Sequence, residues 1–288
     1  MPLAKKKLIG LIILLPIIQS CTFRGIILNY TDTFLISEIE SSLAPTTDKQ
    51  EKIIEQEVKG FWKKARCTYL QDMKQDFEAI SGTLKTGINE QSIEPIKTIM
   101  KKWRRTLFTE GVSLLAKLGP SLSPKQISSL KETFAERTDQ IKETLNLDPE
   151  EYLKERKEKI LDNFETFYGQ ANEQQQTQLF LIYGLNRSRD EIRLENRKYF
   201  NDFFISTLTK SKGSDAIKSK FEAWIETPAL AIPEAKRPAY LKLMDSWYQK
   251  LIATDKLITK QQRQHLVTYL NELKQDLLEQ ALPASECK

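Results

Sequence analysis

Apolar residues recur at steps of three and four along this chain, and this spacing constrains the fold more than any other feature of the sequence. The longest such run is Ile54, Val58, Phe61, Ala65, Tyr69, Met73, Phe77 and Ile80. A period near 3.6 places these side chains on one face of a helix. No comparable run alternates apolar and polar residues, and 10 glycines in 288 residues disfavour a turn-rich β fold. The sequence therefore predicts an all-α protein with no sheet.

Four helix starts carry the same signal, a capping residue three positions before a glutamine. They are Thr47 to Gln50, Ser123 to Gln126, Asn172 to Gln175 and Thr259 to Gln262. In such a capping box the first side chain accepts a backbone amide of the first turn, and the glutamine accepts the amide of the capping residue. Because the intervals between the four boxes are unequal, we interpret them as a recurring start signal rather than as a solenoid repeat.

Turn-forming residues divide the chain into about eight helices, which predicts an elongated helical bundle. The breaks fall at 81–89, 119–120, 148–149, 169, 212–214 and 228–238. We assign residues 1–20 to a signal peptide, 21–45 to the processed N-terminus and a first helix, and 46–288 to a helical domain. The proline-bearing stretch 227–238 is either an internal domain boundary or a loop within one bundle.

The N-terminus has the three regions of a signal peptide. Lys5, Lys6 and Lys7 precede an apolar run of about eleven residues, and Gln19-Ser20-Cys21 follows it. A helix that crosses a bilayer needs about twenty apolar residues, so a permanent membrane span is the poorer interpretation. The segment Ile18-Gln19-Ser20-Cys21 resembles a lipobox, which implies that the thiol of Cys21 is acylated. The alternative is an ordinary secretory signal in which Cys21 is incidental.

A lipidated Cys21 predicts attachment to a membrane through acyl chains such as palmitate, because two or three chains suffice for stable anchoring. Thr22 follows Cys21, where an aspartate would favour retention in the inner membrane. We therefore expect a lipoprotein of the bacterial cell envelope, anchored in the outer membrane and facing the periplasm.

Two further cysteines, Cys67 and Cys287, lie about 220 residues apart. An exported protein can form a disulfide from such a pair, but spacing alone does not prove the pairing, and free or mutually distant thiols are the favoured alternative.

The sequence contains no recognisable catalytic, metal or cofactor motif. It has one histidine, His265, and no glycine-rich phosphate loop. Close pairs among 39 acidic residues are expected by abundance alone. The net charge of +5 falls to about +2 once Lys5, Lys6 and Lys7 are removed, which argues against a nucleic-acid partner. We assign no catalytic residue, no metal ligand and no cofactor, although an enzyme remains an open alternative.

Two groups of charged and aromatic residues stand out. Arg187, Arg189, Arg193 and Arg197 surround two glutamates, which favours an interhelical salt network over an anion or lipid-headgroup patch. Trp62 and Trp103 lie next to lysines and arginines. We expect both tryptophans to anchor the core rather than to contact a membrane.

The region from residue 21 to about 226 resembles an uncharacterised proteobacterial lipoprotein family that carries a domain of unknown function numbered 6279. The resemblance rests on Cys21, Arg24, Asn29, Asp32 with Phe34-Leu35, and the helix starts at Thr47 and Ser123. It implies export, lipidation and helices, and assigns no activity. The Ser/Thr-x-x-Gln boxes also resemble, more weakly, those of small periplasmic chaperones.

These observations predict a noncatalytic, membrane-tethered helical protein that binds or scaffolds another envelope component. The partner would be a client protein, as for a chaperone, or an assembly partner. The alternatives are an envelope enzyme that acts on peptidoglycan with two carboxylates, and a lipid-binding protein with an apolar cavity.

Overall fold

The protein is helical throughout the part that a computed structural model describes, residues 32–287. About 84% of the structure is helical, and these residues contain no strand. The predicted all-α class is confirmed. Cys21 and the rest of residues 1–31 lie outside the described part, so the signal peptide and the lipidation site stay predictions.

The helices follow one another with short connections. In chain order they are α2 (Asp32–Ser42), α3 (Asp48–Lys64), α4 (Leu70–Thr86), α5 (Ile93–Leu118), α6 (Pro124–Asn146), α7 (Pro149–Tyr168), α8 (Glu173–Tyr183), α9 (Ser188–Lys210), α10 (Ser214–Glu226), α11 (Arg237–Asp255) and α12 (Lys260–Leu278). Short 3-10 turns occupy Gly119–Ser121, Pro228–Ala231 and Glu234–Lys236.

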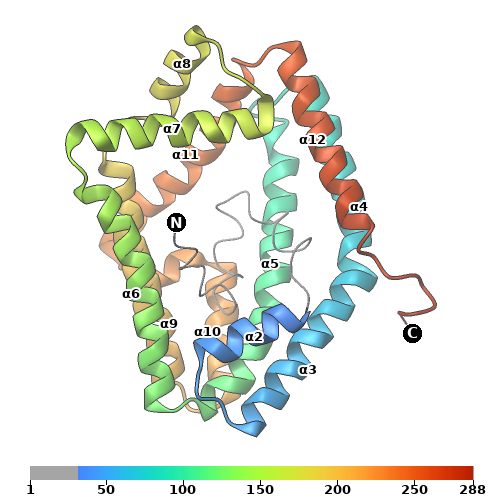
Figure 1. The fold of residues 1–288 in the computed structure, drawn as a ribbon, viewed down its shortest axis with the longest axis vertical. Helices are drawn as coiled ribbons and strands as arrows, with labels where there is room; N and C mark the ends of the chain where they lie inside the picture. Colours follow the sequence, from blue (N-terminus) through green and yellow to red (C-terminus); the bar gives the residue numbers. More distant parts are fainter. Residues whose placement is uncertain (1–31, 288) are drawn as a thin grey trace, which may run out of the picture.

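A π-helical turn, Ala65–Tyr69, joins α3 to α4 without a break. The apolar run from Ile54 to Ile80 therefore lies on one continuous helix, as its spacing predicts. At 1.5 Å per residue, Asp48–Thr86 extends about 58 Å, and it forms one long side of the molecule (Figure 1). With this segment counted as one, the described part has ten helices, close to the eight expected.

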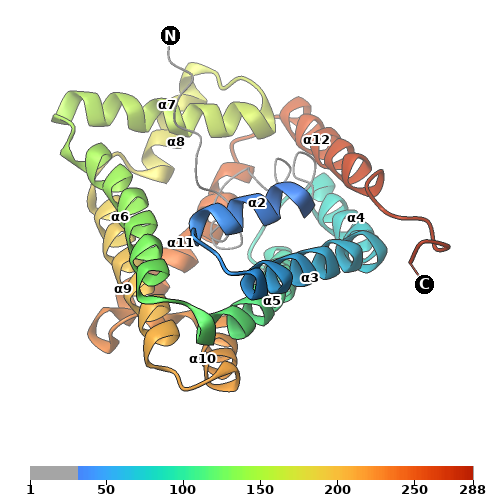
Figure 2. The same cartoon turned by 60° about the horizontal axis from the view of Figure 1, so that its bottom comes forward.

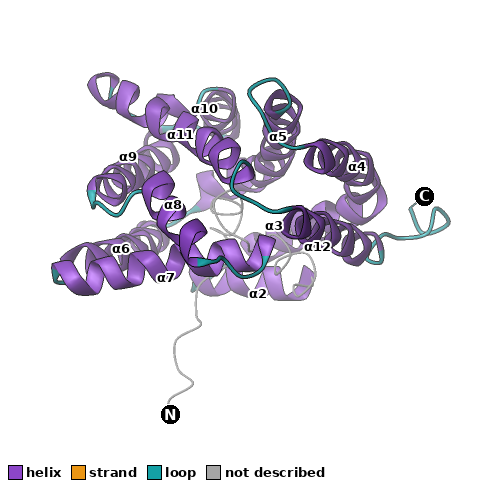
Figure 3. Cartoon of the chain, turned by 90° about the horizontal axis from the view of Figure 1, so that it is seen from above, coloured by secondary structure: helices purple, strands orange, loops and turns teal. Residues whose placement is uncertain are grey.

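The helices are arranged as the sides of an open frame (Figures 1 and 2). In Figure 1, α3, α4 and α12 form the right side, α7 crosses the top, and α6 with α9 forms the left side. Helix α5 runs lengthwise inside this outline. Figure 3 shows α11 along one outer edge and α2 on the opposite side of the molecule.

Buried apolar side chains form four separate clusters rather than one central core. The largest joins α2, α3, α5, α6, α9 and α10 around fully buried Ile54, Leu130, Ile217 and Phe221. A second cluster links α4 and α5 to α11 and α12. Trp103 and Leu277 belong to a third, and a fourth centres on Leu179 between α7 and α8. Contacts between neighbouring sides therefore hold the frame together.

The stretch 227–238, which was open between a domain boundary and a loop, forms two 3-10 turns. Ala229 and Ile232 are buried, and Arg237 Nε donates to the carbonyl oxygens of both, each at 3.1 Å. The stretch is thus packed against its neighbours. Within residues 32–287, no helix combines the length and the apolar character that a membrane span requires.

Candidate functional site

The four predicted capping boxes are all formed, and they meet in two pairs. At the first box Thr47 Oγ1 accepts the Gln50 amide at 3.3 Å, and Gln50 Oε1 accepts the Thr47 amide at 3.1 Å. At the second, Ser123 and Gln126 exchange the same two bonds at 3.2 and 2.9 Å. Each glutamine side chain then reaches the other helix start.

The two glutamine amides of this first junction bind each other. Gln50 Nε2 donates to Gln126 Oε1 at 3.1 Å, and Gln126 Nε2 donates to Gln50 Oε1 at 2.9 Å. The remaining donor of Gln50 binds the Ser121 carbonyl, and that of Gln126 binds the Pro45 carbonyl, both at 3.0 Å. Because both side chains are buried, these bonds replace those that water would supply.

A second junction repeats the arrangement at the starts of α8 and α12. Gln175 Nε2 donates to Gln262 Oε1 at 2.7 Å, and the reverse bond measures 3.2 Å. The remaining donors bind the carbonyls of Leu257 and Gln170, each at 2.9 Å. In both junctions the carbonyl belongs to the residue two positions before the partner's capping residue.

The two junctions lie at opposite ends of the molecule. Helices α3 and α6 both begin at the lower end of Figure 1, and α8 and α12 both begin at the upper end. The boxes thus pair the first with the second and the third with the fourth. Our sequence interpretation of a simple start signal is incomplete, because each box also supplies half of a contact between two helices.

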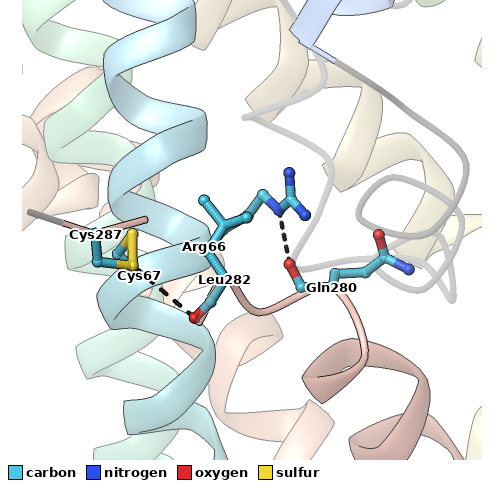
Figure 4. The surroundings of a disulfide bond; sticks show 5 residues. All are labelled: Arg66, Cys67, Gln280, Leu282 and Cys287. Carbon is cyan, nitrogen blue, oxygen red and sulfur yellow. Dashed lines mark hydrogen bonds between the residues drawn. A yellow bond between two sulfur atoms is a disulfide. The ribbon is translucent and has the colours of Figure 1, made fainter. Parts of the chain in front are cut away.

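Cys67 and Cys287 are joined by a disulfide (Figure 4). Two hydrogen bonds accompany it: Leu282 N–H donates to the Arg66 carbonyl at 3.2 Å, and Arg66 Nε donates to the Gln280 carbonyl at 2.7 Å. The π-helical turn leaves the Arg66 carbonyl free to accept the Leu282 amide. In a regular α-helix the Leu70 amide would bond to Arg66, but here it bonds to the Ala65 carbonyl, five residues back. The C-terminal segment is therefore fastened to the middle of the long helix.

Both tryptophans that the sequence places beside cations pack inward, as expected. Trp103 is buried and donates from Nε1 to Asp76 at 2.6 Å, and half-buried Trp62 packs on the largest apolar cluster. His265 is exposed on α12. No group of three or more histidine, cysteine or acidic side chains suited to a metal occurs within residues 32–287.

The arginines of α9, together with Arg187 just before its first residue, form fewer ion pairs than the sequence interpretation favours. Arg193 pairs with Asp190 at 3.1 Å. Arg187 instead donates to the carbonyls of Leu145 and Leu147 and lies over the Tyr152 ring. Glu195, one of the two glutamates expected in the network, pairs with Lys236 of a different segment. A salt network among the α9 arginines is therefore only partly formed.

An exposed apolar face lies on α11. Its members are Leu241, Met244 and Trp247, which are 55%, 40% and 38% exposed. Their spacing of three residues places them on one side of the helix. Of the six large apolar side chains exposed in the described part of the chain, these three and Leu230 lie within residues 230–247. We call Leu241, Met244 and Trp247 the α11 face.

No family model, curated protein or solved structure matches this chain. The resemblance to the lipoprotein family therefore stays a prediction. Sequence reasoning missed the α11 face, although Leu241, Met244 and Trp247 recur at helical spacing, because the same spacing is typical of a buried face.

Proposed function

We propose that this chain is a lipid-anchored envelope protein that binds another envelope protein, without catalysis, through the α11 face. The α11 face is the observation that carries this proposal. Clustered apolar side chains at a surface mark interaction sites, and tryptophan and methionine are enriched in the centres of protein interfaces. Trp247 also packs edge-on against Tyr248, with ring centroids 5.0 Å apart, which limits its mobility before binding.

A protein fits this face better than a bilayer does. Helix α2 begins eleven residues after Cys21, so the predicted anchor is joined to the described part of the chain at the start of α2. Helix α11 lies on the opposite side (Figure 3). We therefore propose that α11 lies away from the membrane and is open to a protein partner.

The disulfide supports an envelope location, because such bonds persist in oxidising compartments such as the periplasm. The predicted signal peptide and lipobox agree with the same location. We favour an assembly partner over a broad set of unfolded clients, because the α11 face presents three large side chains on a single helix.

Site-specific photo-crosslinking in intact envelopes tests the proposal. A photoreactive amino acid replaces Trp247 in one variant and Leu153 of α7 in the control, and both side chains are 38% exposed. We expect one stoichiometric protein adduct from position 247 and none from position 153. The captured protein should then bind purified wild-type chain at least tenfold more tightly than Trp247→Ser.

Other outcomes are equally informative. A ladder of many adducts from position 247 alone would favour the chaperone-like function. Adducts with lipid would support the lipid-binding alternative. Equal labelling from both positions, or unchanged binding by Trp247→Ser, would refute a role for the α11 face.

A further inference from the structure

Two cations from two helices bind the C-terminal end of α8, and a third is close enough for its charge to act on one of them. Arg156 of α7 donates from Nε to the Gly184 carbonyl and from a terminal nitrogen to the Tyr183 carbonyl, both at 3.3 Å. Lys250 of α11 reaches the same Tyr183 carbonyl at 3.4 Å. A helix C-terminus attracts cations, which accounts for one such contact. It does not account for the third cation, Arg189 of α9.

Arg189 lies in the first turn of α9 and is incompletely bonded. Its Nε is buried and has no hydrogen-bond partner within the described part of the chain. A buried donor without a partner is costly, so such an atom in a native protein calls for an explanation. A bound acceptor that the protein itself does not contain would supply one.

Positive charge exceeds negative charge around Arg156, Arg189 and Lys250. The pKa of Lys250 is lowered to about 8, first by burial and then by the charges of Arg189 and Arg156. The pKa of Arg189 is also lowered, by burial and by Arg156 and Arg193. Among the described residues, Asp190 is the one carboxylate whose charge opposes both shifts.

Asp190 is already fully engaged. One of its oxygens accepts the Tyr152 hydroxyl at 2.9 Å, and the other pairs with Arg193 at 3.1 Å. Arg156, Arg189, Arg193 and Lys250 therefore carry more positive charge than the single carboxylate of Asp190 neutralises. The side chains of Arg156, Arg189 and Lys250 are only partly buried, although Arg189 Nε itself is buried.

We propose that Arg156, Arg189 and Lys250 form a binding site for a phosphate group. A phosphate group offers more acceptor oxygens than a carboxylate, which suits two guanidinium groups and one ammonium. The phosphate would belong either to a small soluble molecule or to a lipid headgroup. Lys250 follows Trp247 by three residues on the same helix, so this site adjoins the α11 face, but it does not depend on the function proposed for that face.

Ligand-dependent stabilisation tests the site. The full chain, purified in neutral detergent, is titrated with inorganic phosphate and with monomeric short-chain phosphatidylglycerol at constant ionic strength. Sodium acetate serves as the carboxylate comparison. The variants are Arg189→Gln and Lys250→Gln, and the control is Arg105→Gln, whose exposed side chain pairs with Glu226 elsewhere.

We expect phosphate to raise the unfolding midpoint of wild type and of Arg105→Gln, and acetate to have a much smaller effect. The affinity for phosphate should fall at least tenfold in Arg189→Gln and in Lys250→Gln. Without ligand, both variants should be as stable as wild type or more stable, because a repelling charge has been removed. A variant that fails to fold would have a low unfolding midpoint without ligand, whereas a variant that lacks only the site would keep its midpoint and lose the response to phosphate.

The two phosphate sources separate in the same experiment. Equal affinity for both ligands indicates that the phosphate group alone is recognised, and a preference for phosphatidylglycerol identifies a headgroup site. The proposal is wrong if phosphate and acetate stabilise the protein equally. It is also wrong if neither ligand binds, or if both variants respond as wild type does.

Discussion

Glutamine does more at these helix starts than a capping box requires. A glutamate could also accept the capping residue's amide, but its ionised carboxylate could not donate a hydrogen bond to the start of the other helix. Gln50 and Gln126 each use the oxygen for the local cap and the nitrogen for the partner helix. The same residue therefore satisfies a helix end and fixes where a second helix begins.

Replacing Gln126 by alanine should destabilise the protein by about 3 kcal/mol. The substitution removes a cap contact and leaves the buried amide of Gln50 partly unsatisfied. Urea denaturation followed by circular dichroism measures the loss. The control is Gln140→Ala, an exposed glutamine on the same helix, which should change stability by less than about 0.5 kcal/mol.

A double-mutant cycle isolates the contact between the two amides. Gln50→Ala combined with Gln126→Ala should cost about 1 to 2 kcal/mol less than the two single losses added together. Strict additivity would show that the amides do not stabilise each other.

Lys250 should make stability depend on pH in a characteristic direction. Its pKa is about 8 in the folded protein against a usual value of 10.5, so the unfolded chain holds more protons between these values. Stability therefore rises as pH increases through this window, by about 1 kcal/mol once solvent screening of a partly exposed ammonium is allowed for. Denaturation midpoints from pH 7 to 9.5 should show this rise in wild type and not in Lys250→Met.

At the residue level the sequence predicts local contacts well and distant ones poorly. The bond from Thr47 to Gln50 spans three residues, so its pattern is readable. The bond from Gln50 to Gln126 spans 76 residues and depends on how α3 and α6 pack. The unpaired Nε of Arg189 likewise follows from burial between helices, which an arginine-rich sequence does not reveal.

Among the helices, the connection between α8 and α9 differs most from the sequence prediction. Residues 170–211 carry no proline and one internal glycine, Gly184, so a break there was not expected. In the structure Gly184 has a φ of +71°, a conformation that other residues rarely adopt, and α8 ends at the residue before it. This break aligns the Tyr183 and Gly184 carbonyls with Arg156.

Two glycine substitutions should act in opposite directions. Gly184→Ala should destabilise the protein by about 1 kcal/mol through its positive φ, because nothing lies within 4 Å of the added methyl group. Gly60→Ala, inside α3 and equally free of clashes, should stabilise by about 0.5 to 1 kcal/mol. Thermal unfolding of both variants measures these changes. If both substitutions lowered the stability of the protein, this backbone explanation would be contradicted.

At the scale of the whole molecule, the all-α class could be predicted because each helix carries its own apolar period. The open frame could not. Its shape depends on which helix ends meet, and residues such as Leu179 and Leu277 read as ordinary core positions in any helical bundle. The α11 face was hidden for the same reason, since exposure is a property of the assembled helices.

The disulfide should stabilise the whole frame. Closing a loop of about 220 residues restricts the unfolded chain, and losing the bond should cost about 3 kcal/mol. Urea midpoints with and without reductant measure this difference. The variant Cys67→Ser/Cys287→Ser should start at the lower midpoint and respond to reductant by no more than the error of the measurement.

The same bond also makes the backbone from Cys67 to Cys287 a covalent ring. A protease that cuts once within that ring opens it but releases no fragment, because both pieces remain attached through sulfur. Nine of the eleven connected helices, from α4 to α12, lie inside the ring. A nicked molecule would thus migrate as one chain until it is reduced, and it would keep the α11 face joined to the segment that leads to Cys21.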